Sequence, residues 1–550
     1  MKKRIIIVGI EAYGNSDRSL ALDNLSGALR MHSPHIVKTI NSARHSLKQV
    51  AKTIQSFNPS IICISVRPGG ISYLENIDKI ISLSTHKATV VFGGLTASAS
   101  PDILLSKYPN SIIVIGEGEE AIVDISLKYN GMIDNLREIP NLVYLSNGKL
   151  ISTEKRVVTD KYITISYDDA IEAINSGGVC WIESSRSCSF KCSFCSCRLS
   201  HFNSGWRPLP LKHVVEQLKF FTTKNVRIVS FADLNTFENI ERLIEIADAI
   251  EEKPKSLYIR FDIRADSIYN PRDSKYERKV RYELLQRLKS NGLVQVFIGY
   301  ESCEKSKLHR FHKDTNPTIQ NKALKVLNEI GIDYVLGYIL FDPEMSFEEL
   351  IPNLNYVIDN NLLRHISTPL KQLRVQRGTP LETKMKQKGL LRDLQDNLIY
   401  YNYNYQDSRL TLISNIASYF YFTTAKVYRH SYITNMLQSM NAAPNLQGKF
   451  ESFSYGYKIL ETNLIYDMVD CYQRNNPEKY LIDIVNKYIK LRINMFFKLS
   501  SFYQTLIEDG FQYFQSDMKT FCNYLSRPSE YDLIGVDPAD IIARNINFSF

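Results

Sequence analysis

Residues 180–197 read CWIESSRSCSFKCSFCSC, in which a short apolar run is followed at once by a loop rich in cysteine. Five of the chain's nine cysteines lie in this one stretch. The odd cysteine count argues against a disulfide framework, as does an apolar N-terminal run that stops at Glu11 without a small-residue cleavage site. The clustering therefore calls for a chemical explanation other than disulfide bonding.

The spacing of Cys188, Cys192 and Cys195 predicts an iron–sulfur cluster, because closely spaced thiolates on a loop are its usual ligands. Three ligands on a four-iron cluster leave one iron open, and an open metal position is where metal chemistry occurs. A structural zinc site would require a second CxxC pair or two histidines, and neither follows nearby. The alternative is a loop with three unligated cysteines. The other cysteines are expected to be spare or to pack in the core; they are Cys63, Cys180, Cys197, Cys303, Cys471 and Cys522.

Residues 175–385 alternate apolar runs of strand length with helical patterns. Six such βα units predict a (β/α)6 partial TIM barrel, in which function gathers at the C-terminal ends of the strands. The cysteine loop follows the first of these strands. The strand candidates are residues 180–182, 226–231, 257–262, 294–300, 334–341 and 365–375.

Residues 1–150 contain further apolar runs without polar alternation, separated by helical patterns. Such runs predict strands buried on both faces, as in a parallel sheet covered by helices. We therefore expect an α/β chain that begins with a Rossmann-like, doubly wound domain. Gly93, Gly94, Gly116 and Gly118 follow two of these runs, at the edge where such sheets bind ligands.

Residues 386–550 are dominated by helical periodicity, for example Leu481, Ile484 and Tyr488, and predict a mainly helical C-terminal domain. No run approaches the ~18 to 20 apolar residues of a membrane span, so we expect a cytoplasmic protein without membrane contact. The formal charge of +9 over 550 residues is too thinly spread to predict nucleic-acid binding.

The cysteine motif resembles that of the radical S-adenosylmethionine (SAM) superfamily, and Phe194 matches the aromatic residue that the family places before the third cysteine. The resemblance implies that Cys188, Cys192 and Cys195 bind a [4Fe–4S] cluster whose free iron binds S-adenosylmethionine. An electron from the cluster would cleave the sulfonium and give a 5′-deoxyadenosyl radical. An external electron donor such as flavodoxin or ferredoxin is implied as well.

Later strand ends also resemble the family, and they imply that Asp233, Glu301, Gly337 and Ile339 contact S-adenosylmethionine. Residues 378–381 (GTPL) resemble its closing segment. Two departures stand out: the Gly-Gly-Glu form is absent after the second strand, and Phe341 replaces a glycine of the fifth-strand pattern. From the residues alone, Asp233 could equally cap a helix and Glu301 could be a structural carboxylate.

The first domain resembles the cobalamin-binding domain that precedes the radical domain in the class B, methyltransferase-like enzymes. The resemblance implies that its two glycine turns hold the corrin and the nucleotide tail. The Asp-x-His-x-x-Gly signature is absent, which leaves the coordination of the lower cobalt face open. The alternative is a domain that binds nothing or a different nucleotide. The residues of the two turns are Gly93, Gly94, Gly116, Glu117, Gly118 and Glu119.

Together these resemblances imply a cobalamin-dependent radical SAM enzyme that methylates an unactivated carbon of a natural-product or peptide substrate through methylcobalamin. Residues 386–550 would form a wall or lid over the substrate. One alternative keeps the cofactors but ends in rearrangement or cyclisation without methylation, and another is a non-catalytic cobalamin or redox sensor. Methylthiolation of RNA is disfavoured by the helical tail and the lack of further cluster cysteines upstream. The sequence identifies no catalytic side chain.

Overall fold

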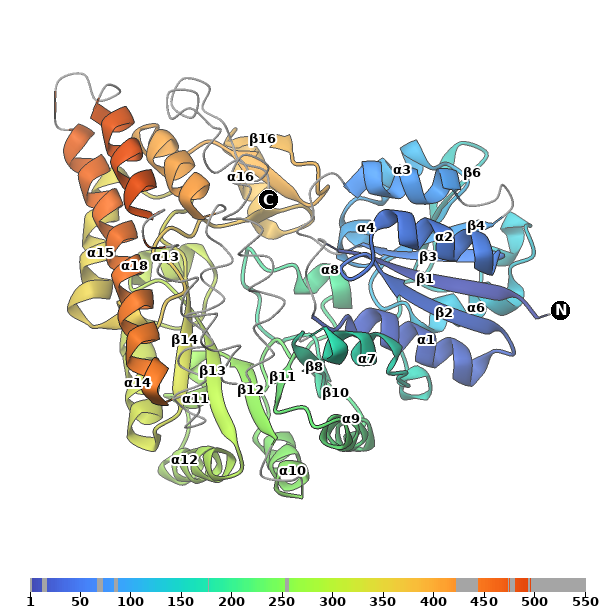
Figure 1. The fold of residues 1–550 in the computed structure, drawn as a ribbon, viewed down its shortest axis with the longest axis horizontal. Helices are drawn as coiled ribbons and strands as arrows, with labels where there is room; N and C mark the ends of the chain where they lie inside the picture. The colour runs from blue at the N-terminus through green and yellow to red at the C-terminus, as the bar shows by residue number, and fades with distance from the viewer. Residues whose placement is uncertain are drawn as a thin grey trace.

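The computed structural model describes residues 2–495 except 12–16, 67–72, 84–87, 177, 253–256, 422–443, 473, 475–479 and 493–494. Cys522 therefore lies outside the described residues. Figure 1 shows an N-terminal α/β domain beside a second parallel sheet, with the C-terminal helices packed against the far side of that second sheet. The predicted α/β class is confirmed.

The N-terminal sheet has seven strands in the order β2-β1-β3-β4-β5-β6-β7 among the described residues. The first five in that order are parallel, and β6 and β7 continue the sheet as antiparallel strands. The strands are β1 (Arg4–Ile10), β2 (Ile36–Asn41), β3 (Ile61–Val66), β4 (Thr89–Gly93), β5 (Ile112–Val114), β6 (Leu142–Ser146) and β7 (Lys149–Ser152).

Both faces of this sheet are buried, as the continuous apolar runs predicted. Ile6 and Val8 of β1 pack in one core with helices α2 and α3, whereas Ile5 and Ile7 pack in a second core with α1 and α6. Alternate residues of a strand point to opposite faces, so a strand covered on both sides is apolar at every position. The helices are α1 (Leu20–His32), α2 (Leu47–Phe57), α3 (Tyr73–Leu83), α4 (Leu95–Ala99), α5 (Pro101–Lys107), α6 (Glu119–Lys128) and α7 (Asp168–Asn175).

The second sheet is the partial barrel. Its order is β14-β13-β12-β11-β8, and every neighbouring pair is parallel. The sixth strand, expected over residues 365–375, is present only as isolated bridges at Ile366 and Gln372. Pro369 lies between them and lacks the backbone N–H that a ladder requires. The strands are β8 (Cys180–Ile182), β11 (Ile228–Phe231), β12 (Tyr258–Ile263), β13 (Leu293–Glu301) and β14 (Asp333–Tyr338).

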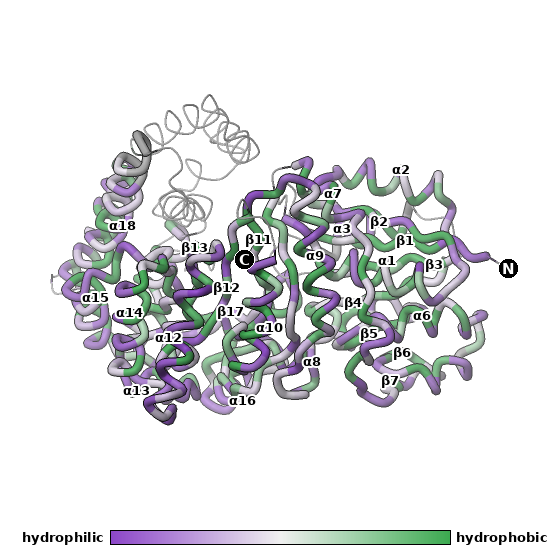
Figure 2. Tube along the Cα trace, turned by 90° about the horizontal axis from the view of Figure 1, so that it is seen from below, coloured by the Kyte–Doolittle hydropathy of each residue, from purple (hydrophilic) through white to green (hydrophobic). Residues whose placement is uncertain are grey.

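Helices on the outer side connect these strands. Figure 2 shows hydrophobic stretches in β1 and β3, the central strands of the N-terminal sheet, and hydrophilic stretches on outer helices of the barrel such as α12. The pattern is that of amphipathic helices with one face on the sheet. The connecting helices are α9 (Leu211–Thr223), α10 (Ile240–Glu251), α11 (Ala265–Ile268), α12 (Lys275–Ser290), α13 (Lys305–Arg310), α14 (Pro317–Ile330) and α15 (Leu350–Asp359).

The segment after residue 385 is less uniformly helical than its periodicity predicted. It opens with β16 (Leu391–Leu394) and β17 (Tyr400–Tyr403), which form an antiparallel sheet with β15 (Val375–Gln376), beside α16 (Pro380–Gln387). The sheet therefore spans the boundary that we expected between residues 385 and 386.

The helices that follow share a core with the barrel. These are a helix over residues 409–421, α18 (Pro444–Tyr472) and a helix over residues 480–492. Buried residues of all three, including Ile413, Ile465 and Val485, belong to the same hydrophobic cluster as the barrel strands. The Lys458 ammonium of α18 donates to the Arg364 carbonyl at 2.8 Å, beside the edge strand β14. This part of the chain thus covers the open edge of the sheet.

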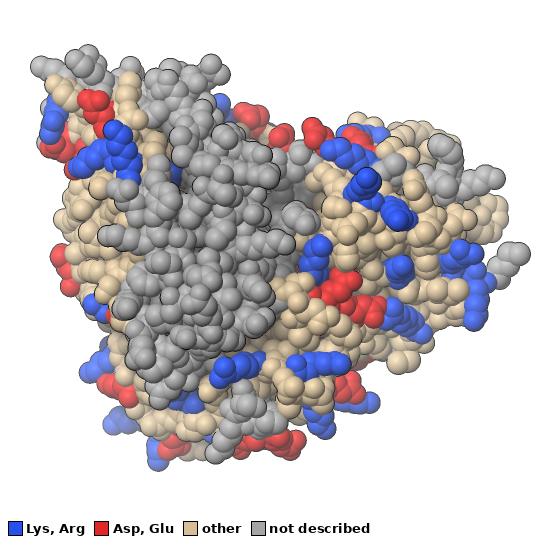
Figure 3. Space-filling model, viewed as in Figure 1, with Lys and Arg blue, Asp and Glu red and all other residues tan. Residues whose placement is uncertain are grey.

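Within the described ranges, no helix combines the length and the apolar character needed to cross a membrane. Figure 3 shows acidic and basic side chains interspersed over the described residues on the face that it presents. That distribution agrees with the thinly spread charge of the sequence.

Candidate functional site

The three predicted cluster cysteines lie on the loop between β9 (Ser185–Arg186) and α8 (Cys197–His201), directly after the first barrel strand. The loop is closed at its base because β9 pairs antiparallel with β10 (Arg207–Pro208). Its middle is fastened by Ser193, whose N–H donates to Phe311 and whose carbonyl accepts from Leu381, both at 2.9 Å. The structure thus brings the three cysteines together on one anchored loop.

Their thiols are partly buried and none forms a disulfide. Burial raises the pKa of Cys195 to about 11 and also raises the pKa of Cys188, so both are protonated thiols until a metal displaces the proton. Cys192 accepts a hydrogen bond from Arg264 Nη1 at 3.6 Å. No three His, Cys, Asp or Glu residues in the described part of the chain could hold a single metal ion. Three thiols on one anchored loop are the chemical type of donor set that holds an iron–sulfur cluster.

Among the other described cysteines, Cys197 lies near this donor set, within electrostatic range of Cys188, Cys192 and Cys195. Cys197 opens α8 with its Sγ 3.6 Å from Ser187 Oγ, and Cys180 is buried in strand β8. Cys303 lies 3.2 Å from Asn353 Oδ1, and Cys471 is buried. The fifth described one, Cys63, lines the cavity described below.

Asp233, at the end of β11, is fully engaged with the turn that leads to the cysteine loop. Its carboxylate accepts from the N–H groups of Ser184 and Ser185 at 2.7 and 3.2 Å and from the Ser184 hydroxyl. Burial raises its pKa to about 6, against the effect of these hydrogen bonds. The structure therefore gives Asp233 an anchoring role, and its contact with S-adenosylmethionine stays a prediction.

Glu301, Gly337 and Ile339 meet at the ends of β13 and β14. Glu301 has a positive φ of 64° and its carboxylate pairs with Lys313 Nζ at 2.8 Å. Its carbonyl accepts from the Ile339 N–H at 2.9 Å. A Cβ on Gly337 would lie 2.7 Å from the Phe297 ring, so a larger residue there would have to displace that ring. The three residues share one strand-end region, and their cofactor contacts stay a prediction.

A cavity of about 230 Å³ lies at the C-terminal edge of the N-terminal sheet and is closed on its other side by the cysteine-loop region. Gly93, in its wall, has open space where a side chain would project, because a Cβ there would meet only Val114 O at 3.8 Å. Asn24 Oδ1 is buried in the same wall without a hydrogen-bond partner. All six predicted turn residues line the cavity: Gly93, Gly94, Gly116, Glu117, Gly118 and Glu119.

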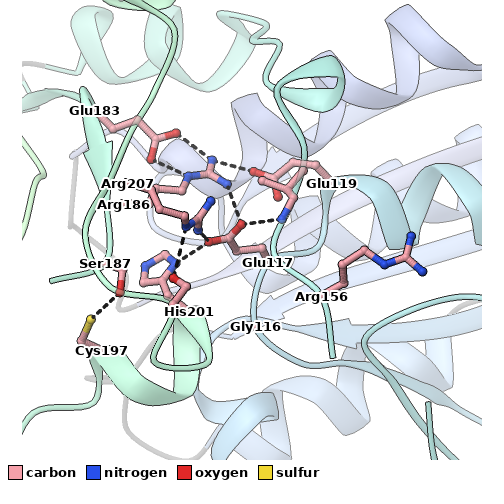
Figure 4. A network of polar contacts seen from close by, with 12 residues as sticks. Gly116, Glu117, Glu119, Arg156, Glu183, Arg186, Ser187, Cys197, His201 and Arg207 are labelled. Carbon is pink, nitrogen blue, oxygen red and sulfur yellow. Dashed lines mark hydrogen bonds and ion pairs between the residues drawn. The ribbon is translucent and has the colours of Figure 1, made fainter. Parts of the chain in front are cut away.

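Glu117 is the centre of a buried ionic network at this boundary (Figure 4). Its carboxylate accepts from His201 Nδ1 at 2.7 Å and from the Val158 N–H at 2.8 Å, and it pairs with Arg207. Burial alone would raise the pKa of Glu117, but the His201 hydrogen bond and the nearby Arg186 and His201 charges hold it below its usual range. An ionised carboxylate here requires that His201 Nδ1 carries a proton.

Arg186 joins this network to the barrel. Its Nη2 donates to Glu119 at 2.7 Å and to Glu183 at 2.8 Å, and its Nη1 lies 3.8 Å from Glu117. Burial opposes the charged form, yet these carboxylates hold the pKa of Arg186 well above its usual range. Arg186 is two residues before Cys188, so the glycine turn of one domain is tied directly to the cluster loop of the other.

The network changes the interpretation of the Gly-Glu-Gly-Glu turn. Glu117 and Glu119 line the cavity, but the structure commits both carboxylates to inter-domain ion pairs. At Gly116, with a φ of 70°, a Cβ would overlap the Phe202 ring. Sequence reasoning missed Arg186, His201 and Arg207, because charged residues around a cysteine loop do not reveal which distant carboxylate they will meet.

The lowered pKa of Glu183 leads us to expect a loss of folding stability in acid. Burial would raise its pKa, but the charge and hydrogen bonds of Arg186 lower it to about 2, from an ordinary value of 4.5. A depressed folded-state pKa contributes stability that is complete above pH 4.5 and is lost as the pH falls towards 2. In urea unfolding, the advantage of wild type over Glu183→Gln should therefore shrink progressively below about pH 5. A difference that is independent of pH would contradict the assignment.

Comparison with known proteins identifies the central part of the chain. Residues 182–356 match the Radical SAM superfamily. A curated relative, 4'-phospho-dehydrooxetanocin synthase of Priestia megaterium, is 26% identical over 368 residues, which span 63% of this chain. The aligned region covers 49% of that relative, so the chain spans about half of its length.

Two solved structures share the fold of the chain. The cobalamin-dependent S-adenosylmethionine radical enzyme OxsB, solved with aqua-cobalamin and S-adenosylmethionine bound, superposes with a TM-score of 0.73 at 18% identity, covering 96% of this chain and 84% of OxsB. The radical S-adenosylmethionine methyltransferase TsrM from Kitasatospora setae, with cobalamin and a [4Fe–4S] cluster bound, gives 0.57 at 15% identity, covering 70% and 75%. Residues 182–356 therefore match a radical SAM domain, and the fold of the chain is that of the cobalamin-dependent enzyme OxsB and of TsrM.

Proposed function

We propose that this protein is a cobalamin-dependent radical SAM methyltransferase that acts on an unactivated carbon of a small-molecule or peptide substrate. The observation that carries the proposal is the direct link between two sites. The anchored cysteine loop and the glycine-lined cavity meet through Arg186, which lines the cavity and lies two residues before Cys188. We also propose that an external one-electron donor such as flavodoxin or ferredoxin reduces the cluster.

The residues present fit the cluster and S-adenosylmethionine. Cys188, Cys192 and Cys195 would hold three irons, while Glu301 and Ile339 lie at the ends of β13 and β14, and Ile339 belongs to the same apolar cluster as Phe194 of the cysteine loop. Bound there, the cluster would supply one electron and an open iron site for the amino acid part of S-adenosylmethionine. The protein's own contribution is to hold the loop, through Asp233 and Ser193, and to keep the thiols partly away from water.

The cavity fits part of a large polar cofactor. Gly93 leaves space in its wall, and the unpartnered Asn24 Oδ1 offers an acceptor to a ligand N–H or O–H. Cobalamin bound there would supply a methyl carrier. No Asp-x-His-x-x-Gly histidine is present, so we assign no protein ligand to its cobalt.

A second outcome, rearrangement or cyclisation without methylation, is favoured by one observation. The curated relative from Priestia megaterium is named a synthase and not a methyltransferase. TsrM, in contrast, is described as a methyltransferase and shares the same fold. The two outcomes use the same cofactor sites and differ in the product.

Anaerobic reconstitution with iron, sulfide and cobalamin tests the proposal. We expect visible absorbance from both cofactors and, with S-adenosylmethionine and a reductant, formation of 5′-deoxyadenosine together with S-adenosylhomocysteine. The nucleoside without the homocysteine product would favour rearrangement. A protein that binds cobalamin but yields neither product would be a sensor, and one that binds no iron would refute the proposal.

A further inference from the structure

Arg264 approaches the cluster loop from a different part of the barrel. It follows the end of β12 and caps the N-terminus of α11. Its side chain is 6% exposed, and its Nη1 donates to the sulfur of Cys192 across 3.6 Å. The contact joins the third barrel connection, from β12 to β13, to one of the three predicted cluster ligands.

The guanidinium is held rigidly in this position. Its Nε and Nη2 donate to the two oxygens of Asp266 at 2.8 and 2.7 Å, a bidentate pair. Its plane lies over the Phe190 ring, 3.5 Å from the centroid, and Phe190 belongs to the cysteine loop itself. The Arg264 backbone N–H donates to Asn235 Oδ1 at 3.2 Å. Because Nε and Nη2 are bound to Asp266, Nη1 is the nitrogen that donates to the Cys192 sulfur.

Burying a cation here is costly, because desolvation offsets much of an ion pair's gain, so the ion pair alone gives no strong reason for the burial. A neutral thiol is a weak hydrogen-bond acceptor and gains little from a guanidinium donor. A thiolate on an iron–sulfur cluster is a strong acceptor, and hydrogen bonds to such sulfurs are one of the means by which proteins set cluster potentials.

We propose that Arg264 is a positioning residue that raises the reduction potential of the cluster held by Cys188, Cys192 and Cys195. The inference rests on the proposed cluster site. Reduction adds one electron, taken from the external donor, and makes the cluster more negative without forming or breaking a bond. A fixed cation and an N–H···S hydrogen bond favour the reduced form. Asp266 offsets part of that charge, but its oxygens bind Nε and Nη2 and leave Nη1 on the sulfur.

The test is a redox titration of the reconstituted holoenzyme, followed by electron paramagnetic resonance of the reduced cluster. Arg264→Gln should shift the midpoint to a more negative potential. At the wild-type midpoint, its ratio of reduced to oxidised cluster should be roughly tenfold lower, as expected for loss of a charge-assisted hydrogen bond. Tenfold corresponds to about 59 mV for a one-electron couple. Arg264→Lys keeps the charge without the fork and should fall between the two.

A matched control is Arg281→Gln. Arg281 is similarly buried, at 8% exposed, and binds Asp273 and the Ser267 carbonyl instead of a cysteine. Its midpoint should equal that of wild type. An Arg264→Gln protein with full iron and sulfide content and an unchanged midpoint would overturn the inference. If that variant loses its cluster, an unchanged midpoint in Arg264→Lys would overturn it instead. A wild-type protein that binds no iron would refute the proposed function and this inference together, whereas an unchanged midpoint refutes the inference alone.

Discussion

Cys192→Ala is expected to abolish the iron–sulfur cluster. The proposed cluster is held by three thiolates on one short loop, so removing the middle ligand leaves two attachments and exposes a further iron. Cys192 also accepts a hydrogen bond from Arg264, so the variant loses this contact between the loop and a charged side chain as well. Iron and sulfide content after reconstitution should fall by at least about tenfold, and formation of 5′-deoxyadenosine should cease.

Cys197→Ala is the matched control. Cys197 follows the same loop as the first residue of α8 and is also partly buried, and its sulfur lies beside the Ser187 hydroxyl. Iron content and 5′-deoxyadenosine formation should stay near wild-type values in this variant. Full cluster content in Cys192→Ala, or its loss in Cys197→Ala, would show that the ligand assignment is wrong.

Arg186→Met is expected to cause the largest loss of stability. Arg186 is 7% exposed and carries ion pairs with Glu117, Glu119 and Glu183, so its removal strands buried carboxylates. Breaking a buried pair from one side costs about 3 to 5 kcal/mol. Anaerobic urea unfolding should show this loss, and it should lessen in acid because the pKa of Glu183 rises when its main cation is gone.

Arg156→Met provides the comparison. Arg156 lies beside the same network in Figure 4, but it is 44% exposed and pairs with Glu120 and Glu154 at the surface. Exposed ion pairs contribute about 0 to 1 kcal/mol, so this variant should unfold close to wild type. Equal effects of the two substitutions would mean that the buried network does not hold the domains together.

Local pattern was sufficient for the strands that position the site. Apolar runs within residues 1–150, and the run at 180–182, form buried strands such as β3 and β8, because strands buried on both faces are apolar at every position. The sixth barrel strand was overestimated because its apolar run contains Pro369. Arg264 could have been noticed, since it stands at the end of a barrel strand, where function gathers.

The resemblance to a known family carried by Cys188, Cys192 and Cys195, and by the glycine turns after two buried strands, was enough to predict the radical SAM fold and both proposed cofactor sites. Such features are local, because residues that are close together in the sequence are enough to form them. Only the folded chain showed that Glu117 binds His201 and Arg207, and that Arg264 reaches Cys192. Those partners are 72 to 90 residues apart, and a charged side chain's partner depends on which surfaces are buried against each other. Which charges meet was decided by the burial of the two domains against each other and not by any local sequence signal.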